Sequence, residues 1–111
     1  MKFVDYTVLI TFDLSYANSS DYDSVNKFLT EKGFEQLSHK GNALPSNTYL
    51  GEDNHLIGKF DSVQEGAEKL KNNIYNSIKR NMNGSGLQSV VFVMVSPKAE
   101  TSYSCSKPID H

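Results

Sequence analysis

One β-branched run near the N-terminus constrains the fold of this chain more than any other feature. In residues 6–12, Val8, Ile10 and Phe12 alternate with threonine and leucine, and the run leads directly into Asp13. This alternation predicts a central strand that is covered on one face and partly wetted on the other. Asp13 would then stand where the strand ends, with its carboxylate open to solvent, a metal ion or a ligand.

A second β-branched run lies near the C-terminus. Residues 90–95 read Val-Val-Phe-Val-Met-Val, within a segment that extends from Leu87 to Ser96. A nearly continuous apolar run of this length is typical of a strand that is buried on both faces. The sequence therefore predicts a second central strand here, next to the first.

Two segments carry helical periodicity. The first follows Ser20 or Asp21 as its cap and stops at Gly33. The second follows Ser62, with Glu65 three residues later in the pattern of a capping box, and stops at Gly84. Each has an apolar stripe that must lie on a sheet: Tyr22, Val25, Phe28 and Leu29 in the first, and Val63, Ala67, Leu70, Ile74, Ile78 and Met82 in the second.

Between the helices, residues 34–40 alternate as an edge strand would, and residues 44–51 form an extended segment that pairs back on them. The order is thus strand, helix, strand, strand, helix, strand. This order predicts an α+β domain with the ferredoxin-like βαββαβ arrangement over residues 1–96, in which a four-stranded antiparallel sheet carries both helices on one face. Residues 97–111 are a polar C-terminal tail with room for a short extra strand over Thr101 to Ser104.

Composition narrows the chemistry and the setting. The 111 residues carry a formal net charge of -2 and a single cysteine, Cys105, so one chain cannot form an internal disulfide or a cysteine-based zinc site. No run approaches the roughly 20 apolar residues of a membrane-spanning helix, and the expected setting is a reducing cytoplasm. The mild acidity gives no overall attraction to phosphate, so nucleic-acid binding would need a local basic face or a bound cation.

The strand end Phe12-Asp13-Leu14, the helix from Asp21 to Gly33 and the last strand resemble the small ferredoxin-like nucleases. That group includes the CRISPR-associated spacer-acquisition nuclease, the VapD-type ribonucleases and the endoribonuclease antitoxin of type V toxin–antitoxin modules. The resemblance covers residues 4–96 in element order. It implies that Asp13 is the catalytic residue and that it holds Mg²⁺ or Mn²⁺ across a homodimer.

Other residues fit the same hypothesis, each with a plainer alternative. Lys69, Lys79 and Arg80 lie on or beside the polar side of the second helix, where they would hold phosphates or simply face solvent. Asp13 itself would bind a divalent cation or only cap a turn. His39 and His55, the histidines inside the fold, would serve as acid or base in RNA cleavage or be exposed without a role.

The sequence therefore supports two functions. The first is a small nucleic-acid-binding or RNA-cleaving protein, a metal-dependent endoribonuclease from a toxin–antitoxin or related defence module. The alternative is a non-catalytic immunity protein or antitoxin that blocks a partner toxin with acidic residues, which are Asp21, Asp23, Glu52 and Asp53. In either case a homodimer is expected, joined through a sheet edge or through the segment after the last strand.

Overall fold

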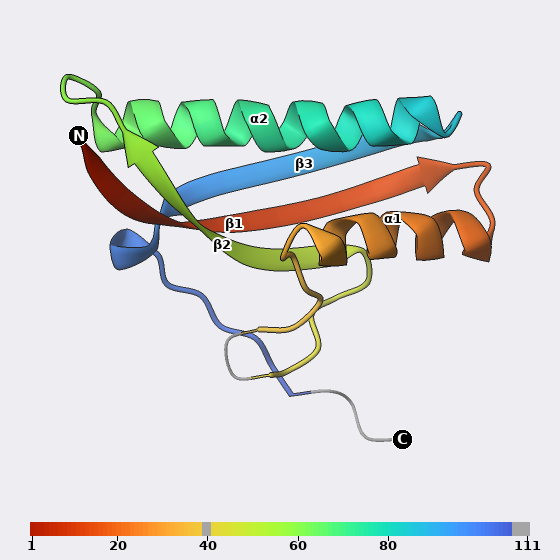
Figure 1. The fold of residues 1–111 in the computed structure, drawn as a ribbon. Helices are drawn as coiled ribbons and strands as arrows, with labels where there is room; N and C mark the ends of the chain where they lie inside the picture. The colour runs from red at the N-terminus through yellow and green to blue at the C-terminus, as the bar shows by residue number, and fades with distance from the viewer. Residues whose placement is uncertain (39–40, 108–111) are drawn as a thin grey trace.

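A three-stranded antiparallel sheet with two helices forms the domain in the computed structural model, which describes residues 1–38 and 41–107 (Figure 1). The elements in chain order are β1 (Lys2–Ser15), α1 (Ser19–Glu31), β2 (Thr48–Ile57), α2 (Val63–Gly84) and β3 (Gln88–Pro97). A short 3-10 helix, η1 (Lys98–Glu100), follows. The strand order is β2-β1-β3, so the α+β class and the adjacency of the first and last strands are confirmed.

The strand β1 is the centre of the sheet, as its alternation predicts. It pairs with β2 on one side and β3 on the other, and Ile10 stands between Tyr49 and Val93. Tyr6, Val8, Ile10 and Phe12 are buried on one face, and Thr7, Leu9, Thr11 and Asp13 alternate with them on the other. The strand continues to Ser15, so Asp13 lies two residues before its end.

Both helices begin at side-chain caps and pack on one face of the sheet. Asn18 caps α1 through the Asp21 N–H, and Ser62 caps α2 through the Glu65 N–H at 3.1 Å. The first helix thus starts slightly earlier than Ser20. Val25 and Leu29 of α1 pack against the buried side chains of β1, and the predicted apolar stripe of α2 packs against the same side chains.

The expected four-stranded sheet is wrong, because residues 34–38 form no strand in the described part of the chain. Glu35 makes one isolated bridge to Leu50, with backbone hydrogen bonds of 2.9 and 2.7 Å. After that bridge the backbone bonds stay within the loop, from Ser38 N–H to Asn42 and from Leu44 N–H to Gln36. These local bonds end the ladder along β2, and the rest of the expected strand, His39 and Lys40, lies outside the described residues.

The last strand is an edge strand, not the doubly buried strand that its composition predicts. Val91, Val93 and Val95 are half-buried toward the helical face. Val90, Phe92 and Met94 face the other way and keep 71%, 52% and 49% of their surface exposed. Burial on both faces requires a second layer, and no described helix or strand covers Val90, Phe92 and Met94 on this side.

The chain after η1 returns along the face of the sheet that the helices leave open (Figure 1). Residues 101–107 have no regular secondary structure, so the extra strand considered over Thr101 to Ser104 is not present. The segment lies against Thr7 of β1 and the loop that contains Ser38, and the Cys105 thiol contacts the Ala43 carbonyl oxygen at 3.6 Å. No helix within the described residues has the length and apolar character needed to span a membrane.

Candidate functional site

The predicted catalytic residue, Asp13, is exposed on the open face of the sheet, opposite Val90 of β3. Its carboxylate makes no hydrogen bond or ion pair with the other residues that the structure describes. Within that part of the chain, no three His, Cys, Asp or Glu side chains gather closely enough to hold a metal ion. A cation at Asp13 would therefore need water, a phosphate or a second copy of the chain to complete its ligands.

The predicted phosphate-binding residues do not converge on Asp13. The Lys69 ammonium pairs with Asp61 at 3.1 Å, and the Lys79 ammonium donates to the carbonyl and hydroxyl oxygens of Ser89, both at 3.0 Å. Arg80 is exposed. Lys69 and Arg80 are eleven positions apart in α2, which is about 16 Å along the axis, and α2 lies on the opposite face of the sheet from Asp13.

His55 lies on the helical side of β2, in a groove of about 350 Å³ between α1 and α2. Asp53 shares the floor of this groove, and apolar side chains of both helices form its walls. The His55 ring meets Tyr6 edge to face, with ring centroids 6.3 Å apart. Lys32 also lines the groove, but no hydrogen bond joins His55 to Asp53 or to Lys32. His39, the other predicted candidate, lies outside the described residues.

The acidic residues of the alternative hypothesis form no common surface. Asp21 accepts a hydrogen bond from the Asn18 N–H in the cap of α1, at 3.0 Å. Glu52 pairs with Lys98 at 3.0 Å on the open face, whereas Asp53 faces the helices. The fold therefore does not bring these carboxylates together into one acidic surface.

The most unusual surface is apolar, and we call it the β3 patch. It consists of Val90, Phe92 and Met94, which β3 holds side by side on the open face. The whole of β3, from Gln88 to Pro97, contains no charged residue. The sequence predicts these side chains to be buried, because a run of six apolar residues does not show which alternate positions lack a covering layer.

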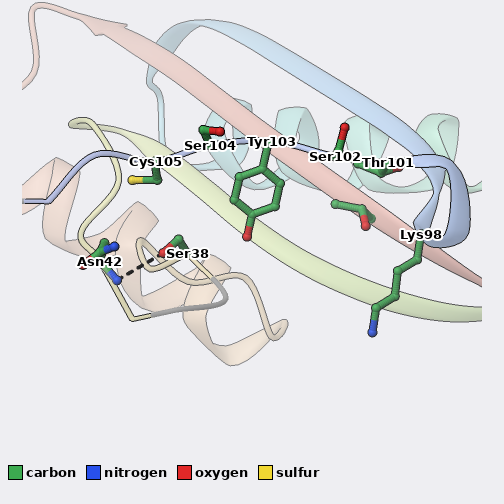
Figure 2. Close-up of a pocket in the computed structure, with 9 residues that line it drawn as sticks. Ser38, Asn42, Lys98, Thr101, Ser102, Tyr103, Ser104 and Cys105 are labelled. Atoms are coloured by element: carbon green, nitrogen blue, oxygen red, sulfur yellow. Dashed lines mark hydrogen bonds between the residues drawn. The ribbon is translucent and has the colours of Figure 1, made fainter.

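A second feature of the open face is a cavity of about 460 Å³ beneath the C-terminal segment (Figure 2). Its floor includes Thr7 of β1, and its sides are the loop with Ser38 and Asn42 and the segment from Lys98 to Cys105. Figure 2 shows Tyr103 extending from the segment between Lys98 and the Ser38 loop. The sequence offered no signal for this cavity, because its residues come from three distant parts of the chain.

Comparisons with family models, with curated proteins and with solved structures found no match to this chain. The resemblance to the small nucleases therefore rests on the order of the elements and on Phe12-Asp13-Leu14 alone.

Proposed function

We propose that this protein acts by binding protein through the β3 patch, and that its first partner is a second copy of the same chain. The observation that carries the proposal is the exposure of Val90, Phe92 and Met94 beside one another on an edge strand. Contiguous exposed apolar side chains are a mark of interaction surfaces. An edge strand without charge is also unprotected against pairing with another chain.

The domain that carries this surface is, in the same proposal, a ferredoxin-like domain with a reduced second strand. The order β2-β1-β3, the antiparallel pairing and the helices on one face agree with that arrangement. The bridge from Glu35 to Leu50 lies on the outer side of β2, where the missing strand would pair.

A second copy fits the β3 patch better than edge pairing alone. Strand-to-strand pairing would satisfy the backbone of β3 but would leave the three side chains facing solvent. Two open faces packed about 10 Å apart would bury the side chains of both copies, and neither patch brings a charge to its centre. Asp13 would stand at the rim of such an interface, since it pairs with Val90.

The size of the patch sets the strength of this dimer. Six half-exposed side chains would gain on the order of 1 kcal/mol each on burial. That gain is comparable to the roughly 4–15 kcal/mol that association costs, so these six side chains leave little net free energy to hold two copies together. We therefore expect a weak dimer that dissociates on dilution.

The test is a charge placed in the patch. Phe92→Lys should raise the dissociation constant of the dimer at least about tenfold, because the ammonium would lose water at the centre of the interface. Light scattering coupled to size-exclusion chromatography measures the mass, and circular dichroism checks that the helices remain.

The matched control is Phe60→Lys, since Phe60 is 92% exposed and lies outside the patch, in the turn before α2. This variant should dimerise like the wild type. Equal dimerisation of all three proteins would reject the patch as the interface. A wild-type monomer that gains mass only with a purified toxin would favour the alternative, a non-catalytic immunity protein or antitoxin.

A second candidate function is RNA binding or cleavage with Mg²⁺ or Mn²⁺ at Asp13. It is favoured by the exposed, unpaired carboxylate of Asp13 within the described residues and by its place at the rim of the proposed dimer. If the wild type cleaves RNA in the presence of either metal, Asp13→Asn should slow cleavage by about a hundredfold or more. Asp23→Asn, which removes another exposed carboxylate, should leave the rate unchanged, and equal rates in all three proteins would remove Asp13 from the mechanism.

A further inference from the structure

The cavity beneath the C-terminal segment is lined by a set of side chains that is unusual for so small a domain (Figure 2). Hydroxyl groups of serine, threonine and tyrosine dominate it, with the amide of Asn42 and the ammonium of Lys98. It shares no lining residue with the β3 patch, so its chemistry stands apart from the dimer proposed above.

Among the described residues that line this cavity, one is charged. This residue is Lys98, and its ammonium already pairs with the Glu52 carboxylate at 3.0 Å. An anionic ligand would have to compete with Glu52, and a cationic ligand would meet Lys98. The other described polar groups of the lining are neutral and both donate and accept hydrogen bonds, which matches the hydroxyl groups of a neutral ligand.

The floor of the cavity includes the hydroxyl of Thr7, which has no hydrogen-bond partner among the described residues. Thr7 is only 6% exposed, and its side chain makes no hydrogen bond with the other described residues. No fully buried side-chain oxygen or nitrogen in that part of the chain lacks a partner, so the Thr7 hydroxyl must keep some access to the cavity. A hydroxyl in this position lowers the stability of the folded protein unless water or a ligand forms a hydrogen bond with it.

The walls are fixed around that hydroxyl. Ser38 is 9% exposed, and its Oγ accepts a hydrogen bond from the Asn42 N–H at 3.1 Å, which ties these two lining residues together. On the other side, the Thr101 hydroxyl donates to the Pro97 carbonyl oxygen at 2.6 Å and anchors the start of the segment to the end of β3. Tyr103 reaches out between these two anchors with an aromatic ring (Figure 2).

We infer that this cavity binds a neutral polyhydroxylated molecule of the size of a monosaccharide or a nucleoside. The volume of about 460 Å³ falls within the roughly 300–1,000 Å³ of ligand pockets. The Thr7 hydroxyl bonds to a ligand hydroxyl from below, and Ser38 and Asn42 bond to it from the side. The Tyr103 ring also lines the cavity, and an aromatic ring packs well against the apolar face of a sugar ring.

The experiment is a titration of the full chain with D-ribose, D-glucose and adenosine, followed by the amide chemical shifts. Binding at the cavity should move the amide signals of residues 38, 42 and 98–105 for at least one of these three probes. Thr7→Val keeps the shape of the side chain and removes the hydroxyl, so it should weaken that binding about fivefold or more.

Thr11→Val is the matched control, because Thr11 lies on the same face of β1 but does not line the cavity. It should bind as the wild type does. Tyr103→Ala changes an exposed residue outside the core, so it can report on the cavity even if Thr7→Val fails to fold, and it should also weaken binding. No shift at the cavity with any probe, or wild-type affinity in the folded variants, would overturn the inference.

Discussion

Asp61 shows how a single carboxylate organises the turn into α2. Its Oδ2 accepts hydrogen bonds from the Lys69 ammonium at 3.1 Å and from the Gly58 N–H at 3.2 Å. The bond from Lys69 is the main reason that the pKa of the Asp61 carboxyl lies below its usual value, and the Gly58 N–H adds to the effect. Lys69 therefore serves the fold at this turn, in addition to any part it takes in binding phosphate.

This lowered pKa makes a prediction about pH. A folded-state pKa below the unfolded value means that Asp61 stabilises the fold above about pH 4, and that this contribution is lost as the pH falls through the folded-state pKa. Asp61→Asn should lower the melting temperature at neutral pH and flatten its decline in acid. Solvent screens this pair, so the effect should be small.

Thermal unfolding monitored by circular dichroism between neutral and strongly acidic pH measures this dependence. Glu68→Gln serves as the control, because it removes an exposed carboxylate from α2. In this variant the melting temperature should fall in acid as steeply as it does in the wild type. If the melting temperature of Asp61→Asn falls in acid as steeply as that of the wild type, the turn does not depend on this charge.

Single residues also mark the limit of prediction from sequence. The solvent exposure of Asp13 follows from the alternation of its strand, which is local information. The partners of Lys79 and Lys69 do not follow, because Ser89 and Asp61 are brought beside them by turns whose geometry the sequence leaves open. The cavity that Thr7 and Ser38 share depends on the path of the chain after β3, so the sequence does not predict it either.

At the scale of elements, α2 lies unusually close to the sheet at Gly66. A Cβ atom there would stand 2.4 Å from the Tyr6 hydroxyl and 2.5 Å from Cγ2 of Ile57. The Tyr6 hydroxyl in turn donates to the Val63 carbonyl oxygen at 2.8 Å and ties β1 to the first turn of the helix. Burial of this side chain raises the pKa of Tyr6 above its usual value.

Gly66→Ala should therefore destabilise the protein by about 1–3 kcal/mol, because helix and sheet must separate to admit the methyl group. Denaturation in urea measures the free energy of unfolding. Gly84→Ala is the matched control, since a Cβ at Gly84 meets nothing within 4 Å, and it should be neutral or slightly stabilising. A loss of stability in the control that equals the loss at Gly66 would contradict the close packing.

The elements that the sequence predicts well are those with local signals. Ser62 and the apolar stripe of α2 define that helix from its own residues, and the alternation of β1 does the same for the central strand. The position of β3 in the sheet is not local, since burial of Phe92 depends on what lies above the open face. The segment from Phe34 to Ser38 alternates like a strand, but it bonds to β2 only through Glu35, and the backbone hydrogen bonds of Gln36 and Ser38 stay within their own loop.

At the scale of the molecule, the domain is flatter and wider than a closed globule. Its radius of gyration is 15.1 Å, against about 13 Å for a compact chain of this length, and its extents are 46 × 37 × 19 Å. Helices cover one face of the sheet, the C-terminal segment covers part of the other, and the β3 patch remains bare in the described residues. A second copy on that patch would supply the missing layer.

The measurement that tests this account most directly is sedimentation equilibrium of the full chain from low micromolar to several hundred micromolar concentration. We predict that the mean mass rises with concentration from the 12.4 kDa of one chain toward twice that value. A mass that stays at one chain throughout would contradict the proposal that the β3 patch joins two copies.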